Sequence, residues 1–318
     1  MFRRWTAHAV RVAFGSGELS YANVIEGLLT LSSVSAQFGN RSLLIFFPKT
    51  MERASMIDWG AFDAVLFDLD GVLTATAQVH AGCWKTVFDQ YFLLSSGVSD
   101  AHASRPFELP HDYRQYVDGK PRYDGVRSFL SSRGVWLPDG TPHDLPAAET
   151  ICGLGNKKSL LFTEAIQAEG VQTYPDAVAL AGYLRKRDIK LGVVSSSRHC
   201  ESILISAGLQ EFFSVRVDGI VAEKVGLAGK PSPETFVYAA RKLGIEPASS
   251  AVVEDALVGV RAAKRGGFGL VVGIDRTEGQ IDLSKSGADL VVTDLEKTLG
   301  IDKNRPVLSE RGRQNHAE

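Results

Sequence analysis

The chain has 318 residues, of which 44% are hydrophobic and 23% charged, and its formal net charge is -2. A chain of this length can bury a core large enough for one main domain and a smaller inserted one. The nearly neutral charge creates no electrostatic field that would attract a polyanion. We therefore do not expect nucleic acid as a partner.

Residues 1–55 form a leader that differs from the rest of the chain. Small and apolar residues follow no clean period there, and Glu18 and Glu26 interrupt the run that a signal peptide would need. No stretch is long enough to span a membrane, so no membrane partner is expected. The leader fits a mis-called start, a targeting segment or a disordered arm, and we expect it to be detached from the folded domain. At the other end, the polar residues 303–318 are predicted to be a disordered tail.

The three cysteines, Cys83, Cys152 and Cys200, are far apart and form no C-x-x-C pair. Their odd number and their spacing indicate neither a disulfide framework nor a zinc site. A reducing, cytoplasmic location is therefore expected. We expect the protein to be a monomer or a weak oligomer.

From residue 61 onward, short apolar runs alternate with amphipathic stretches, which is the pattern of a parallel sheet covered by helices. Gly, Asp or Ser bounds each apolar run. The predicted fold class is α/β, with a Rossmann-like, doubly wound parallel sheet. The predicted strands are residues 64–67, 191–195, 215–217, 251–254, 270–273 and 290–292, and the predicted helices include residues 177–186, 200–207, 233–243 and 259–265.

The interval 75–171 breaks this alternation, because it contains helical stretches but no comparable strand. An inserted α-helical cap domain is the simplest explanation, and residues 61–74 and 172–300 would then form the sheet domain. In open α/β sheets, ligands bind outside the carboxyl ends of the strands. An insertion that begins directly after the first strand would cover that crevice.

Two acids follow the first predicted strand, in the sequence Asp68-Leu69-Asp70-Gly71-Val72. Residues i and i+2 of an extended chain project to the same side, so both carboxylates can face one ligand, and Gly71 permits a sharp turn behind them. Like charges this close repel each other unless a cation or a shared proton intervenes. An Asp-Gly turn that only closes the strand is the alternative.

Two further segments offer groups that bind phosphate. Ser195, Ser196 and Ser197 precede a helix, so their hydroxyls and the helix N-terminal amides can face an anion. A serine N-cap would explain part of this pattern without a ligand. Lys230 lies in a Gly-Lys-Pro-Ser-Pro loop, where its ammonium could balance the charge of a phosphoryl group. An exposed turn lysine is the alternative there.

Glu254 and Asp255 end another predicted strand, directly before a helix. Carboxylate oxygens at this place suit Mg²⁺, which prefers a few carboxylates together with substrate phosphate. Helix capping would explain Asp255 better than Glu254. The four elements together favour a site for phosphoryl transfer, because otherwise all four alternatives would have to hold at once.

These four elements, in this order, resemble the haloacid dehalogenase superfamily of phosphohydrolases and phosphomutases over about residues 61–300. The resemblance implies that Asp68 is the nucleophile that forms an aspartyl-phosphate and that Asp70 is the general acid and base. The phosphate-binding residues that it implies are Ser195, Ser196 and Lys230. The Mg²⁺ ligands that it implies are Asp68, Asp70 through its backbone carbonyl, Glu254 and Asp255.

Within that superfamily, the predicted cap resembles the β-phosphoglucomutase subfamily. His80, followed by Trp84, occurs as in that subfamily's first cap helix. Arg122 falls where the cap supplies an arginine to the second, non-transferring phosphate, and either Lys157 or Lys158 would add another cation. The substrate-binding residues that the resemblance implies are His80, Arg122, Ser197, Arg198 and His199.

The resemblance implies a Mg²⁺-dependent enzyme that converts β-glucose 1-phosphate to glucose 6-phosphate through the 1,6-bisphosphate, so the expected partner is a small sugar phosphate. A plain sugar-phosphate phosphatase would use the same four elements. A non-catalytic module that binds a phosphorylated metabolite would keep the same fold. Two departures from the subfamily bear on the substrate, because Ala75 replaces a usual acid and His199 a usual asparagine.

Overall fold

The computed structural model describes residues 33–38, 41–46, 56–94 and 105–299, and the chain divides into two compact units, Met1–Ala54 and Ser55–Glu318. In the first unit, β1 (Ser33–Phe38) pairs antiparallel with β2 (Arg41–Phe46). The sequence analysis did not predict these strands, although Val34, Ala36 and Phe38 alternate with polar residues in β1; in β2 the apolar residues are consecutive. The rest of the predicted leader and the predicted tail 303–318 lie outside the described residues.

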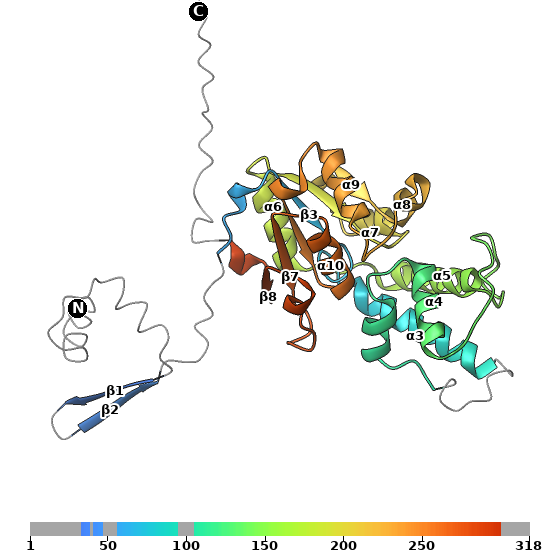
Figure 1. Cartoon of the computed structure of the whole chain (residues 1–318), viewed down its shortest axis with the longest axis horizontal. Helices are drawn as coiled ribbons and strands as arrows, with labels where there is room; N and C mark the ends of the chain where they lie inside the picture. The colour runs from blue at the N-terminus through green and yellow to red at the C-terminus, as the bar shows by residue number, and fades with distance from the viewer. Residues whose placement is uncertain (1–32, 39–40, 47–55, 95–104, 300–318) are drawn as a thin grey trace, which may run out of the picture. The chain divides into compact units, whose positions relative to one another are not determined.

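The second unit is built on a six-stranded parallel sheet with the strand order β5-β4-β3-β6-β7-β8 (Figure 1). This sheet confirms the predicted α/β class. All strand boundaries agree with the prediction within one residue; β4 ends at Val194, one residue earlier than predicted, so Ser195 comes after it. The strands are β3 (Ala64–Phe67), β4 (Lys190–Val194), β5 (Val215–Val217), β6 (Ser250–Glu254), β7 (Leu270–Ile274) and β8 (Leu290–Val292).

Helices pack on both faces of the sheet, because alternate residues of the central strand β3 point to opposite faces. Val65 and Phe67 belong to one buried cluster with residues of α6 and α7, whereas Ala64 and Leu66 belong to another with residues of α9 and α10. Both faces are covered, so the strand is apolar at every position. The helices are α6 (Pro175–Arg185), α7 (Cys200–Ser206), α8 (Gly219–Val225), α9 (Glu234–Leu243) and α10 (Leu257–Arg265).

Helix α8 is an element that the sequence pattern does not predict. It has only seven residues, which is too short for an amphipathic period to be visible. The Asp218 side chain caps it and accepts hydrogen bonds from the backbone amides of Ile220 at 3.0 Å and Val221 at 2.9 Å. The cap satisfies amides that have no partner within the helix.

Between β3 and α6, the described residues form three long helices, α3 (Thr76–Leu94), α4 (Arg122–Ser132) and α5 (Ile151–Glu169), and a π-helical turn η2 (Tyr113–Val117). They enclose a hydrophobic cluster of their own, with Phe88, Phe107 and Phe129 fully buried in it. No strand occurs in the described part of this interval. From this separate core we propose that residues 75–171 form a cap domain, called the cap below.

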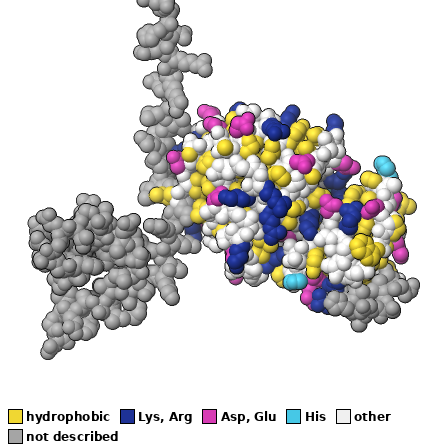
Figure 2. Space-filling view, in the orientation of Figure 1, with side chains coloured by type: hydrophobic (Ala, Val, Ile, Leu, Met, Phe, Trp, Pro, Cys, Tyr) yellow, Lys and Arg dark blue, Asp and Glu magenta, His cyan; other side chains and the backbone are white. Residues whose placement is uncertain are grey.

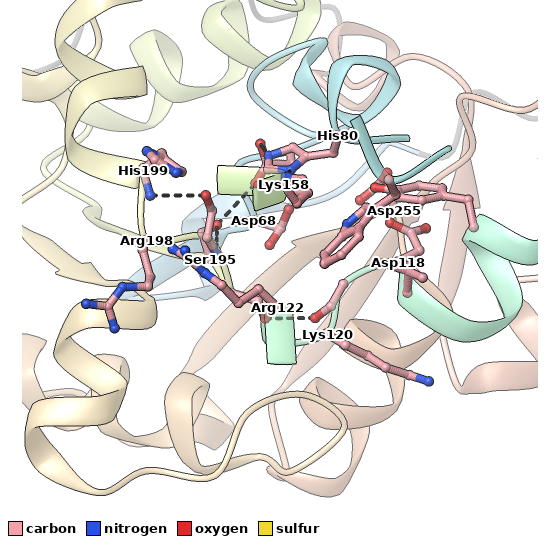
Figure 3. A pocket seen from close by; sticks show the side chains of 18 of the residues that line it. Asp68, His80, Asp118, Lys120, Arg122, Lys158, Ser195, Arg198, His199 and Asp255 are labelled. Carbon is pink, nitrogen blue, oxygen red and sulfur yellow. Dashed lines mark hydrogen bonds and ion pairs between the residues drawn. The ribbon is translucent and has the colours of Figure 1, made fainter. Parts of the chain in front are cut away.

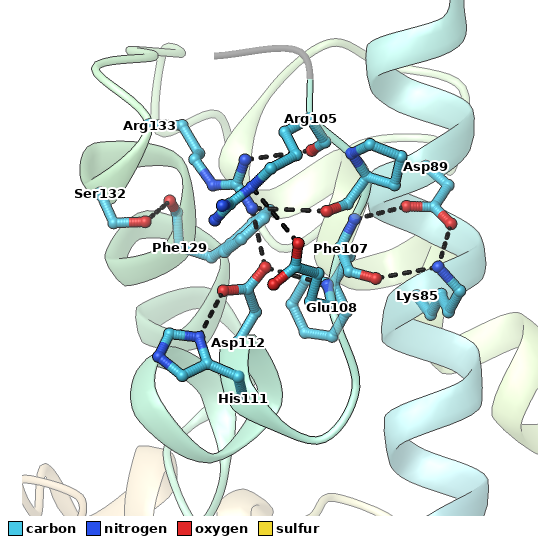
Figure 4. A network of polar contacts seen from close by, with 11 residues as sticks. Lys85, Asp89, Arg105, Phe107, Glu108, His111, Asp112, Phe129, Ser132 and Arg133 are labelled. Carbon is cyan, nitrogen blue, oxygen red and sulfur yellow. Dashed lines mark hydrogen bonds and ion pairs between the residues drawn. The ribbon is translucent and has the colours of Figure 1, made fainter. Parts of the chain in front are cut away.

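A buried network of polar contacts fastens the segment before η2 to the helices of the cap (Figure 4). Arg133 and Asp112 form an ion pair at 2.7 Å, and both side chains are almost fully buried. On the other side, Asp89 of α3 accepts a hydrogen bond from the backbone amide of Phe107 at 2.7 Å. The network therefore holds η2 in a defined position relative to α3 and α4.

The face of the molecule shown in Figure 2 carries basic and acidic side chains interspersed with hydrophobic ones. Among the residues that the structure describes, no helix combines the length and the apolar character needed to cross a membrane.

Candidate active site

The candidate site is a pocket at the carboxyl edge of the sheet, between the sheet and the cap (Figure 3). Strand β3 pairs with β4 on one side and with β6 on the other. The segments that follow these three strands therefore meet, although they are far apart in the sequence. Eleven of the predicted site residues line this pocket: Asp68, Asp70, His80, Arg122, Ser195, Ser196, Ser197, Arg198, His199, Glu254 and Asp255.

Lys230 lies beneath the pocket, where it is 3% exposed. Its ammonium donates a hydrogen bond to Asp68 and another to Glu254, the latter at 2.6 Å. Burial raises the pKa of Asp68 well above its ordinary value; Lys230 opposes this shift, whereas the charges of Glu254 and Asp70 add to it. Lys230 thus supplies one positive charge to two buried carboxyl groups, and a further cation would favour the charged forms of both.

The acidic residues at this edge fit a divalent metal ion. Asp68, Glu254 and Asp255 each offer an oxygen, and these oxygens lie within 4.8 Å of one another. Oδ1 of Asp255 is buried and has no hydrogen-bond partner among the described residues. A Cβ atom on Gly71 would lie 1.9 Å from Oδ2 of Asp255, so only glycine leaves room for that carboxylate. Hard oxygen ligands of this kind suit Mg²⁺.

The side chain of Asp70 lies outside that acidic group and is held by three hydrogen bonds. Oδ1 accepts from the Thr76 hydroxyl and lies 3.1 Å from Nε2 of His80, and Oδ2 accepts from Ser195 at 3.2 Å. Although burial raises the pKa of Asp70, His80 and Thr76 lower it well below its ordinary value. Asp70 is therefore a carboxylate here, and a metal role through its backbone carbonyl stays a prediction.

Lys158 completes a chain of contacts that runs from the cap to Asp70. Its ammonium contacts Nδ1 of His80, whose other ring nitrogen faces Asp70. Burial lowers the pKa of Lys158 to about 7, and the charge of Arg122 acts in the same direction. The sequence left Lys157 and Lys158 as alternatives. The structure places Lys158 in the pocket lining, which does not include Lys157.

The serines after β4 have different partners. The Ser195 hydroxyl accepts a hydrogen bond from the backbone amide of Ser197 at 3.0 Å, which keeps it at the pocket floor. The Ser196 hydroxyl donates to the backbone carbonyl of Gly119 in the cap at 2.7 Å. In this arrangement Ser196 therefore joins the cap to the sheet domain through its hydroxyl.

Further polar and basic groups line the pocket. Arg122 and Lys158 come from the cap, and Nε2 of His199 lies 2.8 Å from the Ser159 hydroxyl, which also comes from the cap. Burial lowers the pKa of His199 to about 4, with Arg122 and Lys158 acting in the same direction, so His199 is neutral. The Arg198 guanidinium is bound by Glu223 of α8 and points away from Asp68 (Figure 3).

Tyr113 and Asp118 are pocket residues that the sequence analysis did not identify. The Tyr113 hydroxyl faces the Asp118 carboxylate and favours its charged form. Burial raises the pKa of Asp118 to about 6; Tyr113 opposes this shift, and the charges of Glu254 and Asp70 add to it. The signal available in the sequence was the position of Asp118 four residues before Arg122, which the resemblance places at the substrate.

Comparison with known proteins agrees with this geometry. A family model described as haloacid dehalogenase-like hydrolase matches residues 62–267. The chain belongs to the haloacid dehalogenase-like hydrolases. Within this family, a β-phosphoglucomutase of Mycobacterium tuberculosis is 45% identical over 245 residues, which are 74% of this chain and 91% of that protein. A β-phosphoglucomutase of Bacillus subtilis is 30% identical over 229 residues, covering 72% of this chain and 88% of that protein.

The solved structure of a β-phosphoglucomutase from Clostridium difficile has a TM-score of 0.57 and 21% identity to this haloacid dehalogenase-like hydrolase, with 74% of this chain and 92% of that chain covered. This likeness shows a shared fold. Together with the 45% identical relative, the family membership establishes an enzyme that transfers or hydrolyses phosphoryl groups. Members of the family generally use Mg²⁺, in agreement with the acidic group of Asp68, Glu254 and Asp255.

Proposed function

We propose that this haloacid dehalogenase-like hydrolase is a β-phosphoglucomutase, which converts β-glucose 1-phosphate to glucose 6-phosphate through the 1,6-bisphosphate. The observation that carries the proposal is that basic groups of the cap line the same pocket as the nucleophile. Asp68 lines this pocket, and Arg122 and Lys158 of the cap line it together with Ser197 and His199. A second anion-binding end is useful when the substrate carries, or acquires, two phosphates.

In the proposed reaction, an Asp68 carboxylate oxygen attacks phosphorus, so an O–P bond forms while the P–O bond to the sugar breaks. The ionised Asp70 takes the proton of the attacking sugar hydroxyl while the phosphoryl group moves from Asp68 to that hydroxyl. Asp70 then gives this proton to the sugar oxygen that leaves when Asp68 attacks the phosphate at the other end of the bisphosphate. The hydrogen bonds from Thr76 and the contact with His80 keep Asp70 ionised, which is the form that accepts this proton.

Asp68, Glu254 and Asp255 would hold Mg²⁺, which neutralises charge on a transferring phosphoryl group. Lys230 also helps to neutralise the charge of the phosphoryl group, since its ammonium is fixed between Asp68 and Glu254 beneath the pocket. Because Lys230 is buried, it belongs to the structural surroundings of the nucleophile Asp68.

A mutase must keep water away from its aspartyl-phosphate, because hydrolysis would turn it into a phosphatase. Besides the contacts of Thr76 and His80 with Asp70, three further contacts hold the cap against the sheet domain. Ser196 bonds to Gly119, Ser159 to His199, and the Arg114 guanidinium donates to Oε1 of Gln280 at 3.0 Å. These contacts support a closed pocket in which a sugar hydroxyl is the acceptor.

A product assay tests the proposal. Purified full chain is incubated with Mg²⁺, β-glucose 1-phosphate and a trace of the 1,6-bisphosphate, and glucose 6-phosphate and free phosphate are both followed. We expect glucose 6-phosphate to be the main product. Mainly free phosphate would reject the mutase and support the sugar-phosphate phosphatase.

Two variants make the result specific to the nucleophile. Asp68→Asn is expected to form neither product while its circular dichroism spectrum stays that of the wild type. Asp63→Asn, just before the opposite end of β3, is the matched control and should keep activity. Turnover by the Asp68→Asn protein would remove the covalent mechanism.

A further inference from the structure

Asp118 is a carboxylate of the cap that lies over the acidic group of the sheet domain. The π-helical turn η2 ends directly before it, and the backbone amide of Asp118 donates to the carbonyl of Tyr113 at 2.8 Å. This i to i+5 bond holds Tyr113 next to Asp118, and the Tyr113 hydroxyl favours the charged form of the Asp118 carboxyl. Short π-helical turns of this kind occur frequently at functional sites.

The backbone next to Asp118 packs directly on the side chains of Ala256 and Val258, which follow Asp255. Gly119 is so close to this surface that a Cβ on it would lie 2.6 Å from Cγ2 of Val258 and 3.1 Å from Cβ of Ala256. Among neighbouring charges, Asp118 acts most strongly on the Asp255 carboxyl. Figure 3 shows Asp118 and Asp255 on the same side of the pocket.

The charges around this contact are only partly balanced by protein groups, because Lys230 acts on Asp255 and Arg114 acts on Asp118 without forming an ion pair with it. Lys230 forms ion pairs with Asp68 and Glu254, and His80 contacts Asp70. In the part of the chain that the structure describes, no ion pair joins Asp118 or Asp255 to a basic side chain, and Oδ1 of Asp255 has no hydrogen-bond partner. The guanidinium of Arg114, in the same turn as Tyr113, is engaged with Gln280.

We propose that Asp118 is a positioning residue for the divalent cation: its charge, brought by the cap, strengthens cation binding at Asp68, Glu254 and Asp255. The inference rests on the proposed function only for the choice of Mg²⁺. Closing the cap without a cation brings one more negative charge to the acidic group, which costs free energy. Closing the cap over a bound cation instead lowers the free energy, because the charge of Asp118 then attracts the cation.

Cation binding and cap closure are therefore linked, and linkage is reciprocal. The cation binds more tightly when the cap is closed, and the cap closes more completely when the cation is bound. A neutral residue of the same shape at position 118 would remove this coupling while the Tyr113 hydroxyl keeps an acceptor.

The affinity for Mg²⁺ alone tests the proposal, measured by isothermal titration calorimetry on the full chain without substrate. We expect Asp118→Asn to weaken Mg²⁺ binding by about tenfold, the lower end of the effect of removing groups that support metal ligands. Asp124→Asn is the matched control, because Asp124 is an exposed carboxylate of the same cap, paired with Arg127. The control should keep the wild-type affinity.

Hydrogen exchange of the backbone amides of residues 113–120 gives a second readout that does not depend on turnover. Mg²⁺ should slow this exchange in the wild type, and the slowing should be smaller in Asp118→Asn. An unchanged Mg²⁺ affinity in a folded Asp118→Asn protein would overturn the proposal, as would an equal loss in Asp124→Asn. Neither result would touch the mutase assignment, which depends on the product assay.

Discussion

Replacing Lys158 by methionine should weaken substrate binding much more at pH 6 than at pH 8. The Lys158 side chain is 5% exposed, and its ammonium lies 4.5 Å from the centre of the Phe162 ring. Burial lowers its pKa to about 7. The side chain is therefore about nine-tenths charged at pH 6 and about one-tenth charged at pH 8.

The size of the effect follows from this charge. A hydrogen bond to a charged group contributes about 1.5–3 kcal/mol, so the methionine variant should have a KM about 10- to 100-fold higher than the wild type at pH 6. At pH 8 the wild type has lost most of the charge, and the ratio of the two KM values should fall by about ninefold. The sign follows from the lowered pKa, because the lysine is a cation only below about pH 7.

The assay is the KM for β-glucose 1-phosphate at pH 6, 7 and 8 for the wild type, Lys158→Met and Lys157→Met. The substrate phosphate also titrates in this range, but it does so equally for all three proteins. Lys157 is adjacent in the same helix and is not part of the pocket lining, so its variant should behave as the wild type. A KM ratio between Lys158→Met and wild type that is the same at pH 6 and pH 8 would refute the reasoning.

Three further outcomes are expected. Asp112→Asn removes the carboxylate from the buried ion pair with Arg133. Chemical denaturation should therefore show a loss of about 3–5 kcal/mol in the free energy of unfolding. A loss below about 1 kcal/mol, the range of exposed pairs, would contradict a buried ion pair. Gly119→Ala should raise KM because its methyl group would meet Val258. Gly134 has the same φ of 69° and open space around it, so Gly134→Ala should change stability but not KM. Equal KM values for the two variants would contradict the proposed cap contact. Mg²⁺ at ten times its Kd should stabilise the protein by about 1.4 kcal/mol and raise Tm, and chelation of the ion should reverse this. The Asp255→Asn protein should not show the Mg²⁺-dependent rise in Tm. If it did, the cation would bind elsewhere.

The sequence by itself determined the sheet and the order of its functional segments. Buried parallel strands are short apolar runs, and the groups that act on ligands follow them, so both can be read locally. Asp68 after β3 and Asp255 after β6 are examples, and the structure brings both to one edge. The lack of strands in residues 75–171 predicted the inserted helical domain, and the resemblance added Arg122, which lines the same pocket.

Only the tertiary structure decided which side chain meets which. It selected Lys158 over Lys157, used the Ser196 hydroxyl to bond the cap at Gly119, and paired Arg198 with Glu223 of an unpredicted helix. These outcomes depend on the direction of a side chain and on contacts between segments far apart in the chain. No local pattern encodes them, because the partner becomes a neighbour only after the cap and the sheet domain have packed together.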